Sequence, residues 1–391
     1  MVITGLEQIS AKIPARLAGK RVGVLCHAPS ITTGFIHISH LLAASRECRL
    51  TTVFGPQHGI FGQTQDNMIE WEGYFDEKLH IPVYSLYGIS RKPTREMLAG
   101  IDALIVDLQD AGARLYTYIW TVKLCMEACS EAGIPVWILD RPNPIGLLGF
   151  DGPVLKEEFF TFVGGAPLPL CHRMTMAEMA LLVRALYLPG CDLNVIPMLN
   201  WHRSSLYNST GLPWVLPSPN LPTLYSTMVY PGSVLIEGLN LSEGRGTTTP
   251  FELFGAPWMN ASKVARELKS RNLPGCTFRE HDYIPVFHKY HGRLCHGIQI
   301  HVTDPELYKP VETALNIFEA IIKLSEPGAL QFNNPPYEYE EHLMPFDILS
   351  GDEKMRLALI NGSSLKAETD RWKSETEEFY RIFREVSLYP E

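Results

Sequence analysis

The stretch IDALIVDLQDAGARLYTYIWTVKLCMEACSEAGIPVWILDRPNP (residues 101–144) indicates the fold of the first half of the chain. Its short apolar runs at residues 103–107 and 135–139 have the length and composition of buried β-strands. Residues 118–132, between them, carry the apolar spacing of a helix. Two strands that are joined by a helical crossover pair in parallel. The stretch therefore predicts a strand, helix and strand of one parallel sheet.

The same alternation of strand and helix is present before this unit. Strand-like runs occur at residues 21–26, 50–54 and 83–87, and a helical segment follows at 94–99. Strands that alternate with helices predict a parallel sheet covered on both faces, which is the doubly wound α/β architecture. No G-x-G-x-x-G follows the first strand and no Walker A sequence occurs, so the sequence predicts no nucleotide cofactor.

The second half of the chain has a different pattern. Helical segments at residues 260–269, 311–324 and 366–384 are mixed with a strand at 297–302, which predicts an α+β domain. The last of these helices alternates charged with aromatic residues and is expected to be an amphipathic surface helix.

The chain is long enough for two domains. At 391 residues it exceeds the size of one ordinary hydrophobic core. The proline-rich segment WVLPSPNLP (214–222) reads as an extended connection close to the boundary. We therefore predict an α/β domain over residues 1–205 and a smaller α+β domain over residues 206–391, with the site in a cleft between them.

Composition and charge limit the possible partners. A net charge of −9 argues against binding to the phosphate backbone of nucleic acids. No apolar run is long enough to span a bilayer. The eight cysteines contain no C-x-x-C pair, which favours reduced thiols and a reducing compartment. Because no signal peptide begins the chain, a cytoplasmic location is expected, with a periplasmic or secreted location as the alternative if an export signal has been removed.

Polar residues follow three strands of the first half. Ligands of doubly wound sheets bind outside the carboxyl ends of the strands, so these residues are candidates for a site. They are Gln57 and His58 after FGP, Asp107 and Asp110 after LIV with Arg114 and Tyr116 beyond them, and Asp140 after WIL.

Each of these candidates also has a structural interpretation. A histidine such as His58 serves as a general base, as a donor to substrate, or as a residue that satisfies backbone carbonyls. An aspartate at a helix start can be a cap, but two carboxylates beside Arg114 exceed what capping requires, so a functional role is favoured for Asp107 and Arg114. Asp140 either binds substrate or fixes Arg141 in a proline turn.

The loop FGPQHGIFGQTQDNMIEWEGY (54–74) follows a predicted strand and is rich in polar residues. Long polar loops at strand ends are frequent locations of binding sites. Besides Gln57 and His58, the loop contains Asp66 and Glu70, and the latter is a further candidate carboxylate.

The stretch LIEGLNLSEGRGTTTPFE (235–252) places many polar groups in one glycine-rich turn. Its glycines permit positive φ or close approach to a ligand, and its charged groups can bind hydroxyls or a carboxylate. It therefore predicts a site for an oxygen-rich small molecule, to which the nearby Asn220 also contributes. The alternative is a turn in which Arg245 forms a purely structural ion pair with a glutamate. The candidates from this stretch are Glu237, Glu243, Arg245 and Thr247.

Metal and common hydrolase motifs are not found in the sequence. The histidines at 288, 291, 296 and 301 fit no zinc spacing, and no carboxylate lies among them, so no metal site is predicted. G-x-S-x-G and H-E-x-x-H are both absent, which argues against a serine hydrolase and a zinc peptidase.

Taken together, the motifs resemble the exo-β-N-acetylmuramidase family, a former domain-of-unknown-function group of glycoside hydrolases that act in peptidoglycan turnover. The resemblance runs nearly end to end. It rests on GPQHGIFG, PVYSLYG, DLQDAGARLYTY, DRPNP, WVLPSPNLP, YPGSVLIEGLNLSEGRGTTTPFELFGAPW and CHGIQIHVTD, in that order.

The resemblance implies a Rossmann-like amino-terminal domain, a smaller carboxy-terminal domain and a substrate cleft between them. It further implies a cofactor-independent hydrolase that releases terminal N-acetylmuramic acid. Such a reaction needs a proton donor for the leaving oxygen and a second group that acts as base, nucleophile or charge stabiliser. Arg245 or Arg114 is expected to hold the lactyl carboxylate of the sugar through a bidentate pair.

One position departs from the family. The family's usual P-E-H-G has a glutamate where this chain has Gln57, and an amide cannot donate an acid proton. Three alternatives follow: another carboxylate supplies the proton, the enzyme acts on a different substrate, or the chain is a muramyl-sugar binding protein that has lost hydrolysis. The expected catalytic residues are His58, Asp110, Glu237 and Glu70; the expected substrate-binding residues are Gln57, Asp107, Arg114, Tyr116, Asp140, Asn220, Glu243, Arg245 and Thr247.

Overall fold

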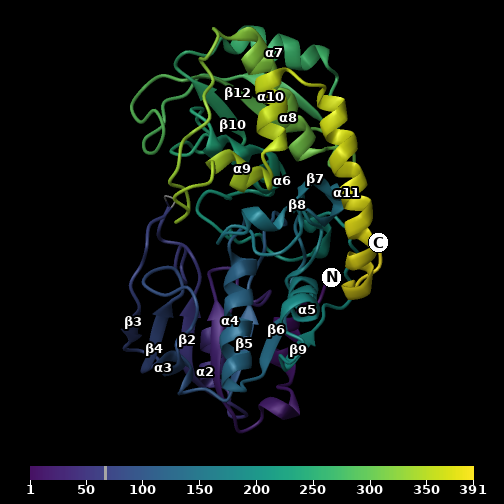
Figure 1. The fold of residues 1–391 in the computed structure, drawn as a ribbon. Helices are drawn as coiled ribbons and strands as arrows, with labels where there is room; N and C mark the ends of the chain where they lie inside the picture. The colour runs from purple at the N-terminus through teal and green to yellow at the C-terminus, as the bar shows by residue number, and fades with distance from the viewer. Residues whose placement is uncertain (66–67) are drawn as a thin grey trace.

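The computed structural model describes residues 1–65 and 68–391, so Asp66 of the polar loop lies outside the described residues. The larger sheet lies in the lower half of Figure 1, and the smaller sheet with its helices lies above it. The larger sheet has the strand order β3-β4-β2-β1-β5-β6-β9. Its strands are β1 (Arg21–Cys26), β2 (Arg49–Gly55), β3 (Tyr74–Asp76), β4 (Ile81–Ser85), β5 (Ala103–Asp107), β6 (Val136–Leu139) and β9 (Leu193–Ile196).

Six of these strands are parallel, and only the edge strand β3 runs antiparallel to its neighbour β4. Numbered in chain order, the parallel strands follow the arrangement 3-2-1-4-5-6 of dinucleotide-binding Rossmann folds. The expected doubly wound sheet is therefore confirmed. The short β3 was not predicted from the sequence.

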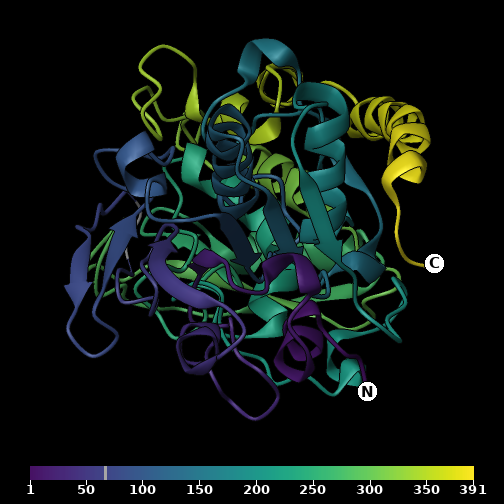
Figure 2. The same cartoon turned by 90° about the horizontal axis from the view of Figure 1, so that it is seen from below.

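Alternate residues of the central strands pack on opposite faces of the sheet. Val24 and Ile105 lie in the cluster that includes residues of helices α1 (Gly5–Ala11) and α2 (Ile38–Ala44). Leu25 and Leu104 lie in the other cluster, under α3 (Arg95–Leu98), α4 (Tyr118–Ala132) and α5 (Met176–Tyr187). Figure 2 shows these two helical layers on either side of the sheet. Both faces are buried, which explains why the strands read as continuous apolar runs.

Local signals account for the helix ends in this half. Helix α4 ends at Gly133, which has φ of 68° and so adopts the left-handed conformation of a helix C-cap. The spacing of Thr175 and Glu178 in the sequence predicts a capping box, and helix α5 begins with one between these two residues.

The second half contains a three-stranded antiparallel sheet with the order β10-β12-β11. Its strands are β10 (Leu253–Ala256), β11 (Cys276–Glu280) and β12 (His296–Val302). A separate antiparallel pair, which comes from the first half of the chain, is formed by β7 (Asp151–Val154) and β8 (Pro169–Cys171). The helices are α6 (Leu224–Ser233), α7 (Ala261–Ser270), α8 (Pro310–Leu324), α9 (Pro345–Ser350), α10 (Lys354–Asn361) and α11 (Leu365–Val386). Short 3-10 helices are η1 (Ala15–Leu17), η2 (Gly146–Leu148), η3 (Glu157–Phe159), η4 (Tyr207–Thr210) and η5 (Val234–Gly238). The predicted α+β character is confirmed, and the boundary at 205/206 stays a prediction.

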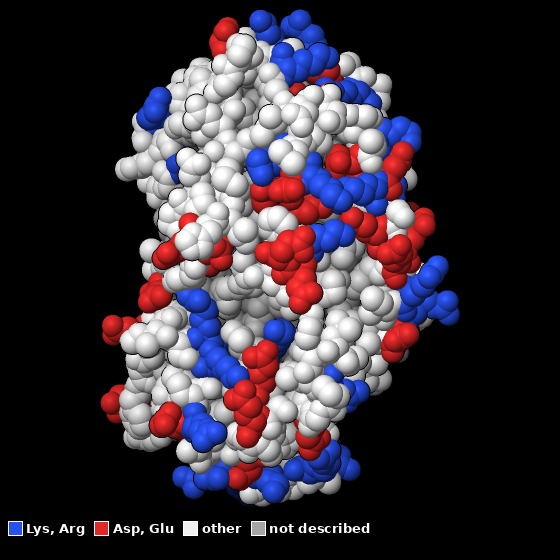
Figure 3. Space-filling view, in the orientation of Figure 1, with Lys and Arg blue, Asp and Glu red and all other residues white. Residues whose placement is uncertain are grey.

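Helix α11 links the two halves. It is amphipathic, as expected, and buries Trp372, Phe379 and Phe383 while its other face is exposed. It packs against β7 and against α5, and in Figure 1 it descends along the side of the molecule toward the N-terminus. Its partly buried Arg371 pairs with Asp352 and with glutamates of its own helix, and Figure 3 shows basic and acidic side chains interspersed along this region.

Candidate functional site

A pocket lies between the two halves of the molecule. One wall is formed by the residues that follow β2 and β5, and the other by the segment around η5 and by residues 337–338. The pocket brings together six of the residues selected from the sequence: Gln57, His58, Tyr116, Asn220, Glu237 and Arg245. Six polar or aromatic residues were not anticipated: Thr117, Ser218, Tyr230, Phe251, Tyr337 and Glu338.

Gln57 is held in place by the start of α4. Thr117 Oγ1 donates to Gln57 Oε1 at 2.7 Å, and the Tyr118 hydroxyl donates to the Gln57 carbonyl at 2.9 Å. With Oε1 occupied in this way, the Gln57 Nε2 group has no protein partner among the described residues. It therefore offers two N–H donors at the pocket wall.

His58 is a neutral imidazole in this setting. Its Nδ1 donates to the Thr64 carbonyl at 2.8 Å, so Nε2 is the acceptor and receives the Ser218 hydroxyl at 3.2 Å. Burial and, to a smaller extent, the charge of Arg245 outweigh the hydrogen bond to the Thr64 carbonyl and lower the pKa of His58 to about 4. His58 can therefore accept a hydrogen bond or a proton at neutral pH, but it is not a reservoir of acid protons.

Glu237 is the carboxylate of the opposite wall. It lies on η5, and Arg245 Nη2 donates to its Oε1 at 2.6 Å. The Tyr337 hydroxyl donates to Oε2, also at 2.6 Å. Arg245 in turn lies 4.9 Å from the centre of the Phe251 ring, which gives it a cation–π contact. Both oxygens of Glu237 are thus oriented by fixed donors.

The glycines that flank Arg245 shape this wall. Gly244 and Gly246 have φ of 75° and 76°, a conformation that side chains other than glycine rarely adopt. A Cβ atom on Gly246 would come within 2.7 Å of the Phe287 carbonyl oxygen. The turn therefore needs glycine at this position, as its sequence indicated.

Glu243 lies behind the pocket and holds Arg245 from the other side. Its carboxylate is 3.3 Å from Arg245 Nε, 3.1 Å from His288 Nδ1 and 3.2 Å from Lys289 Nζ. Burial alone would raise the pKa of Glu243, but Lys289, His288 and Arg245 outweigh it and hold the pKa well below its usual range. Burial lowers the pKa of Arg245, but the negative charges of Glu237 and Glu243 outweigh burial and raise that pKa above its usual value.

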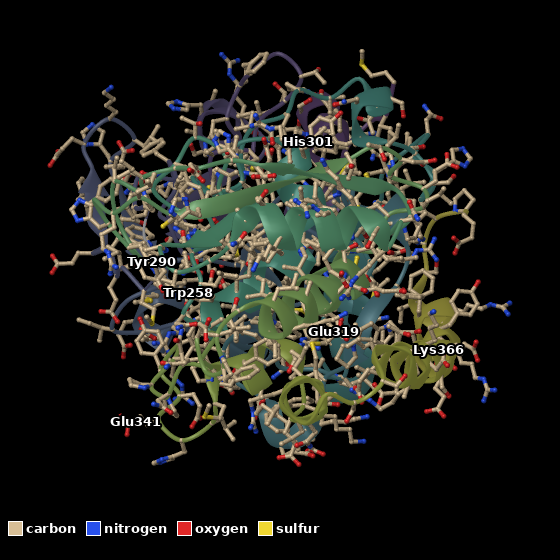
Figure 4. All side chains as sticks on the ribbon, turned by 90° about the horizontal axis from the view of Figure 1, so that it is seen from above. Trp258, Tyr290, His301, Glu319, Glu341 and Lys366 are labelled. Carbon is tan, nitrogen blue, oxygen red and sulfur yellow. The ribbon has the colours of Figure 1, made fainter. Side chains whose placement is uncertain are left out.

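A second layer fixes the backbone of the same turn. Lys289 Nζ donates to the carbonyls of Ile236 and Leu241 at 2.8 and 3.1 Å. The Tyr290 hydroxyl donates to the Asn240 carbonyl at 2.6 Å and accepts from Trp258 Nε1 at 3.1 Å. Figure 4 shows Trp258 and Tyr290 side by side.

Glu338 is a second carboxyl group in the pocket, and its surroundings differ from those of Glu237. Its side chain is only 5% exposed and accepts one hydrogen bond, from the Tyr87 hydroxyl at 3.2 Å. Burial and then the charge of Glu237 raise the pKa of Glu338 to about 7. The residue belongs to PPYEYEEH (335–342), where acids alternate with aromatics after two prolines. We did not select Glu338 from the sequence, and this composition is the signal that could have identified it.

Asn220 carries an acceptor into the pocket. The residue is 1% exposed, and its Nδ2 donates to the Gln65 carbonyl at 2.6 Å. Its Oδ1 has no hydrogen-bond partner among the described residues. A buried acceptor without a partner is costly, and a ligand N–H or O–H can satisfy it.

Three of the other selected residues are buried in structural contacts outside the pocket. Asp107 is fully buried and accepts from Arg141 Nη2 at 2.8 Å, at the point between β1 and β5 where Rossmann folds bind nucleotides. Asp140 accepts from the Ala177 backbone at 2.9 Å and from Tyr389, and burial raises its pKa to about 7. Arg114 donates to the carbonyls of Pro153, Leu168 and Leu349 at 3.2, 3.0 and 2.8 Å, and burial lowers its pKa to about 9.

The remaining selected residues also lie outside the pocket lining. Asp110 accepts from the Gly112 backbone at 2.7 Å and lies 3.3 Å from His172 Nε2. Glu70 is exposed and accepts from the Tyr339 hydroxyl at 3.1 Å. Thr247 closes its own turn by donating to the Gly244 carbonyl at 2.6 Å.

The pocket is narrow, and its lining of charged, polar and aromatic side chains suits a polar ligand. Its volume of about 40 Å³ leaves room for about three water molecules, which is less than a sugar ring occupies. Within residues 1–65 and 68–391, no group of three His, Cys, Asp or Glu side chains is placed to hold a metal ion. In the same residues no helix combines the length and the apolar character needed to cross a membrane.

Known proteins match the chain along nearly its whole length. Residues 22–225 match the family described as exo-beta-N-acetylmuramidase NamZ, N-terminal, and residues 228–389 match its C-terminal counterpart. The peptidoglycan beta-N-acetylmuramidase NamZ of Bacillus subtilis (strain 168) is 40% identical over 388 residues, which are 99% of this chain and 91% of that protein.

Two crystal structures of DUF1343 family proteins from Bacteroides fragilis NCTC 9343 share the fold. One has a TM-score of 0.87 at 30% identity and covers 99% of both chains. The other has a TM-score of 0.78 at 29% identity and covers 100% of this chain and 99% of its own. The two family matches together cover both halves of the molecule, and the chain therefore belongs to the exo-β-N-acetylmuramidase family.

Proposed function

We propose that this chain is an exo-acting glycoside hydrolase that releases terminal N-acetylmuramic acid from peptidoglycan-derived glycans. Membership of the family makes it a glycoside hydrolase, and the named activity of its Bacillus subtilis relative supports the muramyl substrate. The observation that carries the proposal is the pocket in which Glu237 and Arg245 face Gln57 and His58 from the other half of the molecule.

The pocket offers groups for each polar part of the sugar. N-acetylmuramic acid carries a lactyl carboxylate, which a guanidinium binds better than an ammonium does. Arg245 is the arginine at the pocket wall, whereas Arg114 is fully buried elsewhere, so we assign the lactyl carboxylate to Arg245. The Asn220 Oδ1 acceptor and the Gln57 Nε2 donors suit the acetamido group and the ring hydroxyls.

Glu237 is assigned the second carboxylate role of glycoside hydrolysis. Its oxygens are fixed by Arg245 and Tyr337, and it lies in the pocket where positive charge develops on the sugar ring. A fixed carboxylate at this place serves as nucleophile, as base for a water molecule, or as stabiliser of the oxocarbenium-like transition state.

A second function is favoured by one residue. Gln57 lies in the pocket at the place where the family has glutamate, which supports a muramyl-sugar binding protein without turnover as the alternative. The eight free cysteines support a reducing compartment such as the cytoplasm, and an exported location is the alternative.

The test compares hydrolysis of 4-nitrophenyl β-N-acetylmuramide with that of the matching N-acetylglucosaminide. Wild type, Gln57→Glu and Glu237→Gln are assayed, with Glu72→Gln on the exposed loop as the matched control. Release from the muramide by wild type, lost in Glu237→Gln and kept in Glu72→Gln, is the expected result. Turnover that appears only in Gln57→Glu would instead identify the binding protein, and no turnover in any variant would refute the muramidase assignment.

A further inference from the structure

We propose that Glu338 is the proton donor to the leaving oxygen in this chain, the role for which Gln57 lacks the chemistry. The inference rests on the proposed function, because it assigns a step of that reaction. The sequence alone selected Glu70, Asp110 and Glu237 as candidate acids and did not select Glu338.

Position is the first support. Among the carboxylates of the described residues, Glu237 and Glu338 are the two that line the pocket, and Gln57 lines it too. Asp110 and Glu70 are engaged outside it, with His172 and Tyr339 respectively. A general acid must lie within hydrogen-bond reach of the leaving group, so the pocket limits the choice to these two glutamates.

The different surroundings of the two glutamates are the second support. Glu237 accepts from the Arg245 guanidinium at 2.6 Å and from the Tyr337 hydroxyl, and both contacts favour its ionised form. Glu338 is buried, accepts one weak hydrogen bond from a neutral tyrosine, and forms no ion pair among the described residues. Two carboxylates in one site whose environments differ in this way divide into a charged member and a protonated member.

The groups that act most strongly on the pKa of Glu338 lie outside its own segment, so its protonation depends on the folded pocket. Glu237 and burial favour the protonated form, while Arg91, Arg245 and the Tyr87 hydroxyl favour the ionised form. Burial and Glu237 prevail, and the pKa of about 7 keeps a large fraction of the acid protonated at neutral pH.

The segment that carries Glu338 is fixed against the first half by its neighbour. The Tyr339 ring lies 3.4 Å from the guanidinium carbon of Arg91, and the same guanidinium lies 4.9 Å from the Phe162 ring. The Tyr339 hydroxyl donates to Glu70 at 3.1 Å. Glu338 itself has a positive φ of 45°, an uncommon conformation for a glutamate that these contacts maintain.

Protonated Glu338 transfers its proton to the glycosidic oxygen while the bond from that oxygen to C1 breaks, and the bonding electron pair remains on the oxygen. Water then supplies hydroxyl to C1. Its proton returns to Glu338 if Glu237 has formed a glycosyl intermediate, or passes to Glu237 if water attacks directly.

The experiment uses two leaving groups that differ in their need for an acid. A 4-nitrophenolate leaves without protonation, whereas the sugar alcohol of an N-acetylmuramyl-β-1,4-N-acetylglucosamine disaccharide does not. In Glu338→Gln we expect kcat/KM on the disaccharide to fall by about 10²- to 10⁴-fold, with less than about a tenfold fall on the 4-nitrophenyl muramide. Glu341→Gln is the matched control on the same segment, since Glu341 is exposed and points away from the body of the molecule in Figure 4.

Each result has a defined meaning. Equal losses on both substrates would overturn the acid role and indicate binding or folding, which circular dichroism of the variant separates. Full activity of Glu338→Gln on the disaccharide would overturn it directly, while the proposed function stands. A wild type that cleaves neither substrate would refute the proposed function and the acid role with it.

Discussion

The guanidinium carbon of Arg91 lies 3.4 Å from the centre of the Tyr339 ring, and this contact joins two segments that are about 250 residues apart in the chain. Arg91 belongs to the first half and Tyr339 to the segment that brings Glu338 to the pocket. A single aromatic ring therefore helps to fix the position of a buried carboxyl group that lies next to it in sequence.

Replacement of Tyr339 is expected to weaken catalysis without removing any pocket residue. Tyr339→Ala loses the cation–π contact, worth about 0.5–2 kcal/mol, so kcat/KM on the disaccharide should fall about tenfold. Tyr339→Phe keeps the ring and its contact with Arg91 and loses the exposed bond to Glu70, so it should stay within about twofold of wild type. Steady-state kinetics of both variants provides the check, and wild-type activity of the alanine variant would contradict the positioning role.

The pH dependence should report the proton on Glu338. Its pKa is raised to about 7, first by burial and then by Glu237, so kcat/KM on the disaccharide should fall as the pH rises above about 7. The Tyr87 hydroxyl stabilises the ionised form, so Tyr87→Phe should raise the pKa further and move the falling limb to higher pH. A limb that stays in place or moves to lower pH in this variant would argue against Glu338 as the titrating group.

Arg245 is expected to distinguish muramic acid from glucosamine. Arg245→Lys keeps a charge but loses the planar fork, so the preference for the muramide over the N-acetylglucosaminide should shrink. Arg245→Ala leaves Glu237 and Glu243 without their shared cation, and activity should fall by about 100-fold or more. Both glycosides are assayed side by side, with Arg266→Lys on the exposed face of α7 as control. An unchanged preference in Arg245→Lys would mean that another group binds the lactyl carboxylate.

The ion pair between Asp107 and Arg141 should matter for stability rather than for turnover. Arg141→Ala leaves the Asp107 carboxylate buried without its partner, which should lower the free energy of unfolding by about 3–5 kcal/mol. Denaturant unfolding of this variant is compared with Arg16→Ala, whose pair with Asp192 is exposed and should contribute less than about 1 kcal/mol. A raised KM at unchanged stability would instead place Asp107 in substrate binding.

Much of the fold could be predicted from the sequence because its signals are local. The apolar run at 103–107, the helix at 118–132 and the capping box at Thr175 each depend on residues within one element, and β5, α4 and α5 formed as expected. Strand β3 was not predicted because three residues at a sheet edge carry too little periodicity.

The site was predictable only in part, because burial and pairing are tertiary properties. Gln57, Asp107 and Asp140 all follow strands, but only Gln57 lines the pocket. Asp107 accepts a hydrogen bond from Arg141 and Asp140 accepts one from Tyr389, and no local sequence pattern identifies these partners. Glu338 lies about 100 residues after Glu237 and adjoins it only once the chain has folded.

The last residues of the chain restrict how a sugar can enter a pocket of about 40 Å³. Helix α11 returns to the first half, where the Tyr389 hydroxyl bonds to Asp140 and accepts from the Met198 backbone at 2.9 Å. Arg203 N also donates to the Pro390 carbonyl at 3.0 Å, so the halves are fastened together beyond their main connection. A wide hinge opening between the two halves would break these hydrogen bonds. A cross-link that reinforces the contact of Tyr389 with the first half should therefore not slow turnover.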